Sequence, residues 1–173
     1  MIIELPRLRL RPFKSFDADA VVAGLNDWEV AQWVINPPYP YRLEDFQRYA
    51  RMVDEDHAKD CPTQFAVARR DSDEFVGSVA VGLKPDGLGE LGYWFCRGHW
   101  GEGFATEASM AVVTQAMSHS AVTRIYATVD PENGASRRVL AKIGFAFGHE
   151  YTREQPTRRG TSRSWVFVFS ANT

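Results

Sequence analysis

The chain has 173 residues, with 20 basic and 22 acidic side chains and a formal net charge of −2. This length suits one domain with a sizeable core. A net charge so close to zero argues against a dedicated nucleic-acid-binding protein, which would normally have a strong excess of basic residues. Its two cysteines, Cys61 and Cys96, provide neither a disulfide framework nor a metal-ligand spacing, so we expect no metal.

The N-terminal segment and the hydropathy of the chain bear on location. Residues 1–13 alternate charged and apolar side chains and lack the apolar core of a signal peptide. No stretch approaches the ~20 apolar residues of a membrane span. We therefore expect a soluble, cytoplasmic protein with no membrane or nucleic-acid partner, either a monomer or a homodimer.

The first part of the chain predicts one strand and three helices. Residues 8–13 alternate apolar and polar side chains, a pattern typical of a strand. Apolar residues at helical spacing follow over 17–25, 28–34 and 42–59. A proline run at 37–40 separates the last two helices with a rigid loop.

The rest of the chain predicts a mixed arrangement of strands and helices. Strands at 64–69, 75–83 and 91–96 have short connections that suit an antiparallel meander. The later predicted elements are a helix at 104–119, a strand at 125–129, a helix at 133–143, and strands at 145–151 and 165–169. Gly144 stands where a left-handed helix C-cap belongs. Together these elements predict a single α/β (α+β) domain over residues 1–173.

The segment from Glu90 to Ala108 is the most informative, because it combines a strand, a glycine-bearing loop and a helix start. Gly101 and Gly103 let backbone N–H groups converge on a ligand without side chains in the way. The following helix N-terminus adds free donors and a partial positive charge. The segment predicts a pyrophosphate site, and a plain strand-to-helix turn that needs both glycines is the alternative.

Two common phosphate-binding motifs do not fit this segment. The P-loop requires Gly-Lys-Ser/Thr, whereas Gly103 is followed by Phe104 and Ala105. The dinucleotide fingerprint requires a third glycine where Thr106 stands. Asp130 does end the next strand, as a ribose-binding acid would, but an antiparallel meander is wrong for a βαβ opening.

The segment instead resembles the acetyl-CoA loop of the GNAT superfamily, Gln/Arg-x-x-Gly-x-Gly/Ala. Here it reads Trp100-Gly101-Glu102-Gly103-Phe104-Ala105, with Trp100 in place of the usual first residue. That replacement resembles the RimJ/RimL branch, the ribosomal-protein N-terminal acetyltransferases and their relatives. Residues 7–12, 92–94 and 132–136 are also similar to that branch and occur in its order.

The resemblance implies the GNAT fold, a mixed and mostly antiparallel sheet of six to seven strands, flanked by helices, with splayed central strands. It also implies acetyl-CoA as cosubstrate. The implied cofactor-binding residues are Tyr93, Trp94 and Phe95 for the pantetheine arm, Gly101, Glu102, Gly103, Phe104, Ala105 and Thr106 for the pyrophosphate, and Asn133. A backbone N–H near Phe95 would polarise the thioester carbonyl. The side chains at 93–95 are equally expected to pack the core and cleft.

The candidate catalytic residues are Ser136, which the resemblance implies, and Glu90, which lies at the start of the cofactor-binding strand. Ser136 would protonate the departing thiolate, or else bond to backbone in the first helical turn. Asn133 would bind the cofactor or cap that helix. The tyrosine acid of many GNAT enzymes is replaced by Leu140, and a carboxylate found in some relatives by Thr128. Glu90 is then the candidate base, with a solvated strand-edge carboxylate as the alternative.

We therefore expect acetyl transfer from acetyl-CoA to a primary amine, a protein N-terminus or a small amine, by direct attack. The alternative is a catalytically degenerate acetyl-CoA-binding sensor or scaffold, because the usual tyrosine and carboxylate are missing. Aromatic residues at 28–41 and four arginines at 153–163 are expected to line the acceptor entrance. The arginines would disfavour a polycation and bind acidic groups, or would simply face solvent.

Overall fold

The computed structural model describes residues 1–59, 61–84 and 86–169. The strands are β1 (Ile3–Glu4), β2 (Leu8–Arg11), β3 (Gln64–Arg69), β4 (Phe75–Leu83), β5 (Leu88–Phe95), β6 (Arg124–Val129), β7 (Phe145–Thr152) and β8 (Arg163–Phe169). The α-helices are α1 (Ala18–Asn26), α2 (Trp28–Ala31), α3 (Leu43–His57), α4 (Phe104–Met117) and α5 (Gly134–Lys142). Short 3₁₀ turns occupy Ser15–Asp17 and Arg97–His99.

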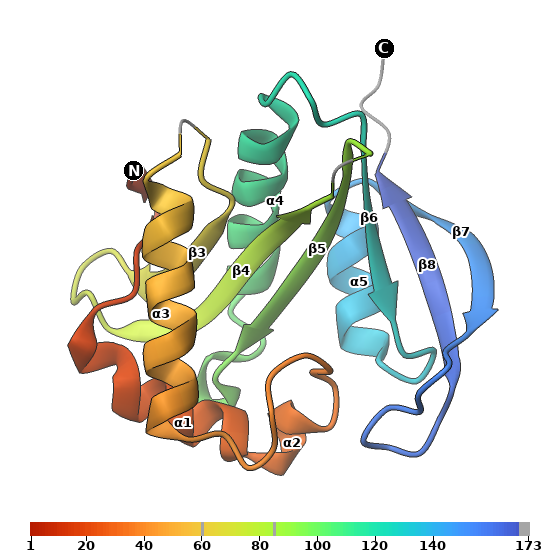
Figure 1. Ribbon diagram of the computed structural model, residues 1–173, viewed down its shortest axis with the longest axis horizontal. Coiled ribbons are helices and arrows are strands. Elements are labelled where there is room, and N and C mark those ends of the chain that lie inside the picture. The colour runs from red at the N-terminus through yellow and green to blue at the C-terminus, as the bar shows by residue number, and fades with distance from the viewer. Residues whose placement is uncertain (60, 85, 170–173) are drawn as a thin grey trace.

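The strands form one sheet in the order β1-β2-β3-β4-β5-β6-β8-β7 (Figure 1). Every neighbouring pair is antiparallel except β5 and β6, which run parallel. The mixed, mostly antiparallel sheet of the prediction is confirmed. It has eight strands where six to seven were predicted, because residues 3–4 form β1. Two residues are too few to show a strand's alternation in the sequence.

The pairing between β5 and β6 is confined to one end of the two strands. It joins Leu88 to Arg124, Gly89 to Ile125 and Glu90 to Tyr126. Beyond that point the strands diverge in a V (Figure 1), whereas β5 stays paired with β4 as far as Phe95. The divergence frees one edge of β5 to pair with an extended ligand.

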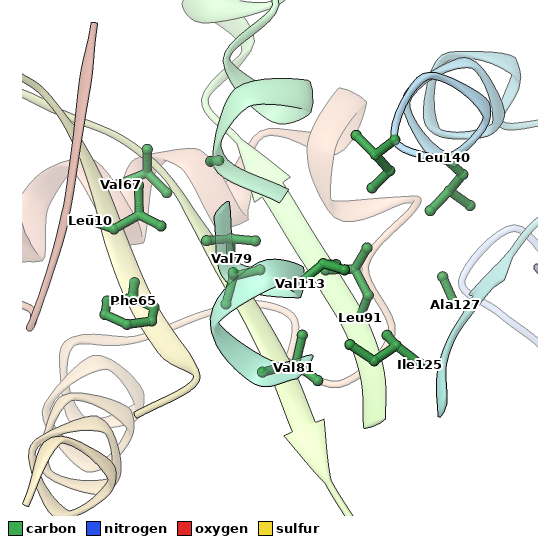
Figure 2. Close-up of a cluster of buried hydrophobic side chains, with 14 of the residues drawn as sticks. Leu10, Phe65, Val67, Val79, Val81, Leu91, Val113, Ile125, Ala127 and Leu140 are labelled. Carbon is green, nitrogen blue, oxygen red and sulfur yellow. The ribbon is translucent and has the colours of Figure 1, made fainter. Parts of the chain in front are cut away.

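Two hydrophobic clusters fill the two faces of the sheet. The larger lies under α4 and α5 and is shown in Figure 2. The smaller lies under α1 and α3. The continuous apolar run of β3 contributes side chains to both clusters, since Phe65 and Val67 belong to the larger cluster and Ala66 to the smaller. The sheet is therefore buried on both faces over its centre, and this holds β5 rigidly.

The predicted elements are present, with ends that differ by a few residues. The strand predicted at 91–96 begins earlier, at Leu88. The helix predicted at 28–34 ends at Ala31, because residues 32–33 continue only as a turn before the proline run. Gly144 has φ of 89°, which confirms the left-handed C-cap. In the described part of the chain, no helix has the length and apolarity needed to cross a membrane.

Candidate active site

A cleft of about 1820 Å³ is centred on the gap between β5 and β6. Both strands line it, together with the first turns of α4 and α5 and residues of the α1–α3 layer. It contains Glu90, Tyr93, Trp94, Phe95, Gly101, Gly103, Phe104, Ala105, Thr106, Asn133 and Ser136. Of the predicted site residues, only Glu102 is absent from the lining, because its carboxylate lies near His99 and Arg69.

The loop before α4 has the geometry of an anion site. Gly101 and Gly103 both have φ of 82°, a left-handed conformation that favours glycine. Gly103 is the N-cap of α4, and no side chain caps the helix. The first N–H groups of α4 are thus free for a ligand. A Cβ placed on Gly101 would meet nothing within 4 Å, so the loop has room for a phosphate group.

Arg7 fixes this loop from the start of β2. Its Nε donates to Glu107 Oε2 at 2.8 Å, and its Nη1 donates to the Glu102 carbonyl at 2.7 Å. Its guanidinium also lies 5.0 Å from the centre of the Phe104 ring. These contacts tie the loop to the first turn of α4 and bring a positive charge close to it. Sequence reasoning missed this role, because the contacts span about a hundred residues.

Trp100 stands where relatives carry glutamine or arginine, and the structure gives it a role. Its indole N–H donates to the Phe95 carbonyl at 2.9 Å. The bond joins the end of β5 to the glycine loop across the short Arg97–His99 turn. The two parts of the site, strand and loop, are therefore held together at this point.

The backbone of β5 alternates between β4 and the gap. Cys96 N donates to Val76 O at 2.9 Å, so the backbone of Trp94, two residues earlier, also faces β4. The N–H and C=O groups of Tyr93 and Phe95 consequently point into the gap. The Trp94 side chain packs beside Phe75, with ring centroids 5.7 Å apart.

Ser136 and Tyr93 meet across the cleft. The Tyr93 hydroxyl lies 2.8 Å from Ser136 Oγ and 3.2 Å from the Ser136 carbonyl. Asn133 Oδ1 accepts from Ser136 N at 3.0 Å, so Asn133 does cap α5. Its Nδ2 group is not needed for that cap. The Ser136 hydroxyl points at β5 and bonds to the Tyr93 side chain. A capping serine would instead bond to the backbone of its own helix.

A family profile, the acetyltransferase (GNAT) domain, matches residues 7–146. The chain belongs to this family. The uncharacterised N-acetyltransferase YoaA of Bacillus subtilis (strain 168) is 30% identical over 156 residues, covering 83% of this chain and 82% of its own. These likenesses make the chain an enzyme of the GNAT N-acetyltransferase kind.

Solved GNAT structures share the whole fold. An acetyltransferase from Bacillus anthracis superposes with a TM-score of 0.80 at 24% identity, covering 98% of both chains. RimL, described as a ribosomal L7/L12 alpha-N-protein acetyltransferase in complex with coenzyme A, gives 0.80 at 17% identity, covering 97% of both. The expected likeness to RimJ/RimL acetyltransferases is therefore confirmed at the level of the fold.

Glu90 lies where the GNAT strands part, and it is fully hydrogen-bonded. Thr128 donates to its Oε1 at 3.1 Å, Tyr126 donates to its Oε2 at 3.1 Å, and Lys84 Nζ lies 3.4 Å from Oε2. Thr128, at the position where some relatives carry a carboxylate, thus binds a carboxylate from the neighbouring strand. Both oxygens of the Glu90 carboxylate are thus engaged by groups of the protein, two hydroxyls of β6 and the Lys84 ammonium.

Cys96 is not poised as a nucleophile. Burial raises the pKa of its thiol to about 11, so the reactive thiolate is scarce at neutral pH. This agrees with direct attack, which needs no covalent enzyme intermediate. Within residues 1–59, 61–84 and 86–169, no cluster of three His, Cys, Asp or Glu side chains could hold a metal ion.

The predicted acceptor segments are joined by two arginines. Arg158 donates to the carbonyls of Ala31, Val34 and Pro37. Arg159 donates to Gln32 Oε1 at 2.7 Å. Both side chains are engaged by the α2 segment, although Arg159 stays partly exposed to solvent. Of the other two arginines, Arg163 pairs with Glu150 at 2.9 Å and Arg153 lines the cleft.

The aromatic segment contributes only part of the expected wall. Trp33 and Tyr41 line the cleft. Trp28 and Tyr39 pack on one another with ring centroids 5.9 Å apart, and both are about half exposed. The expectation of four aromatic cleft residues is therefore reduced to two.

Proposed function

We propose that the protein transfers an acetyl group from acetyl-CoA to a primary amine by direct attack. The observation that carries this proposal is the uncapped N-terminus of α4 with its two left-handed glycines, set beside the open edge of β5. An extended pantetheine arm fits an unpaired strand edge, and a pyrophosphate fits a free helix N-terminus. Acetyl-CoA supplies the activated acetyl group.

The proposed binding residues follow from that geometry. The N–H and C=O of Tyr93 and the N–H of Phe95 face the gap and would pair with the pantetheine arm, whereas the Phe95 carbonyl is bonded to Trp100. The N–H groups of residues 101–106 would hold the pyrophosphate, and Asn133 Nδ2 remains able to donate to the cofactor. A backbone N–H near Phe95 would polarise the thioester carbonyl.

The proposed chemistry needs one proton donor from the protein. The amine nitrogen forms a bond to the acetyl carbon, the carbon–sulfur bond breaks, and the sulfur leaves with the electron pair. Ser136 Oγ gives its proton to that sulfur and recovers one from solvent, while the Tyr93 hydroxyl stays protonated and hydrogen-bonded to Ser136. The amine loses its proton to water, since a free α-amine with a pKa of ~8 is partly neutral in the cell.

The test is release of coenzyme A, followed with a thiol reagent, for a panel of primary amines that includes N-terminal peptides, amino acids and polyamines. We expect release that depends on the amine, with the acetyl group recovered on its nitrogen. Tight binding of acetyl-CoA with no release for any amine would support the sensor or scaffold alternative and reject turnover.

A further inference from the structure

We propose that the acceptor is a small amine that also carries a carboxylate, as a free α-amino acid does, and that Asp130 and Arg153 receive these two groups. The inference rests on the proposed function, because it names the class of acceptor for the same cleft. It is carried by charged side chains that line the cleft and have hydrogen-bonding atoms without partners.

Asp130 immediately follows β6 and presents one unsatisfied oxygen. Its side chain is only 7% exposed. Its Oδ1 accepts from Glu132 N at 2.9 Å and so fixes the turn before α5. Its Oδ2 is buried and accepts no hydrogen bond from any described residue. Such an atom is costly to leave unpaired, and a cationic donor is the partner that suits it best.

Arg159 does not satisfy this oxygen. Its Nε lies 3.7 Å from Asp130 Oδ2, too far for a hydrogen bond. The guanidinium is instead bonded to Gln32 and Glu132, and it stacks 4.4 Å from the centre of the Trp33 ring. Two carboxylates thus share one guanidinium, and Asp130 Oδ2 keeps no hydrogen-bond donor among the described residues.

Arg153 provides the opposite charge on the same side of the sheet. Val129 pairs with Trp165, and Asp130 and Ser164 stand one residue further along each strand, so they share a face. Arg153 Nε donates to Ser164 Oγ, which brings the guanidinium to the row that Asp130 occupies. Its Nη2 is buried and finds no hydrogen-bond partner in the part of the chain that the structure describes.

A hydroxyl completes this pair of charges. Thr157 Oγ1 also lies in the cleft, buried, and none of the described residues bonds to it. The ammonium of an amino acid would donate to Asp130, and its carboxylate would accept from Arg153 and Thr157. A polyamine offers nothing to Arg153, and a peptide N-terminus presents a neutral amide where the carboxylate would be.

The enclosure around these residues also favours a small acceptor. Arg158 binds the carbonyl of Ala31 at the end of α2 and those of Val34 and Pro37 beyond it, and so holds the 153–162 loop against this segment. Figure 1 shows both segments at the open end of the V between β5 and β6. A long peptide would have to pass between two segments that are bonded to each other.

The deciding experiment pairs a change in the acceptor with a change in the protein. Steady-state kinetics would compare free amino acids with their C-terminal amides, which keep the α-amine and lose the carboxylate. In the unmodified enzyme we expect KM to be about 10- to 100-fold higher for the amide, the effect of losing a charge-assisted hydrogen bond. In Arg153→Gln, KM for the amino acid and KM for its amide should become nearly equal.

Asp130→Asn tests the other charge. Asparagine keeps the Oδ1 acceptor that fixes the Glu132 turn, so the fold should be retained. We expect KM to rise for acids and amides alike, while acetyl-CoA affinity stays the same. Arg163→Gln is the matched control, because Arg163 pairs with the exposed Glu150 outside the cleft and should leave the preference for the acid unchanged.

Equal turnover of acids and amides by the unmodified enzyme would overturn the inference, even if Arg153→Gln failed to fold. So would a preference for N-terminal peptides, or an Arg153→Gln variant that keeps the full preference for acids. These results differ from failure of the proposed function, in which no amine of any class supports release of coenzyme A.

Discussion

At the residue scale, the site depends on a hydroxyl pair that only the fold brings together. The resemblance to the RimJ/RimL branch pointed to Asn133 and Ser136, which lie one helical turn apart. The partner Tyr93 could not be predicted, because it lies 43 positions from Ser136 on a strand expected to contribute only its backbone. Burial raises the pKa of Tyr93 to about 12, so it stays protonated and can hydrogen-bond to Ser136 at any physiological pH.

Replacing Ser136 tests this assignment. Ser136→Ala should lower kcat by up to the ~10²–10⁴-fold typical of a general acid, because the lost proton matters chiefly in the transition state. Acetyl-CoA affinity should be nearly unchanged, as measured by calorimetry. Tyr93→Phe is the matched variant, since it keeps Ser136 and removes only the hydroxyl that bonds to it. We expect kcat to fall less in Tyr93→Phe than in Ser136→Ala. Unchanged turnover in Ser136→Ala would reduce Ser136 to a structural role.

At the element scale, the proposed anion site is built by the glycine loop and α4 together. Arg7, Trp100 and the two left-handed glycines hold the loop against the helix start. From the sequence, the glycine spacing left a plain turn open as the alternative, and the resemblance to the GNAT motif favoured a cofactor loop. The contacts that hold it could not be predicted, because Arg7 reaches it from another strand and Trp100 is a departure from the usual motif.

Gly103→Val should weaken acetyl-CoA binding about 10- to 100-fold, the loss of one or two hydrogen bonds to a charged group. Its φ of 82° is strained for any side chain, and a Cβ would lie 3.4 Å from Arg7 Nη2. Gly98→Ala is the control, because a Cβ there meets nothing within 4 Å. Titration calorimetry on both folded variants measures the difference. Full affinity in Gly103→Val would mean that the loop is misassigned.

At the scale of the whole molecule, the order of elements and the sheet's mixed character were predictable from sequence periodicity. The contacts that join the 153–162 loop to the α2 segment could not be predicted, because Arg158 and Arg159 contact residues more than 120 positions away in the sequence. From the sequence alone, arginines in a loop are expected either to face solvent or to bind a ligand. Only the fold shows that these two arginines bind another part of the chain.

Two tyrosines with raised pKa values make the stability of the whole fold depend on pH in the alkaline range. Burial raises the pKa of Tyr41 and of Tyr93 to about 12, above the ordinary value of 10. The neutral forms favour the folded state, so stability is fully retained below pH ~10 and declines as pH rises from there towards 12. By pH 11, Tyr93 should account for about 1 kcal/mol of the decline.

Urea unfolding at pH 8, 9.5 and 11 measures this decline, and Tyr93→Phe should make it shallower. An unfolding midpoint that does not change with pH, or an equal decline in Tyr93→Phe, would contradict the burial of this phenol.

Thermal unfolding with and without nucleotides tests the central claim most directly. Ligands that bind the native state stabilise it, by about 2.7 kcal/mol at a hundred times Kd. Acetyl-CoA and coenzyme A should both raise the melting temperature in a concentration-dependent way, and NAD should not. Stabilisation by NAD without stabilisation by either form of coenzyme A would contradict the account.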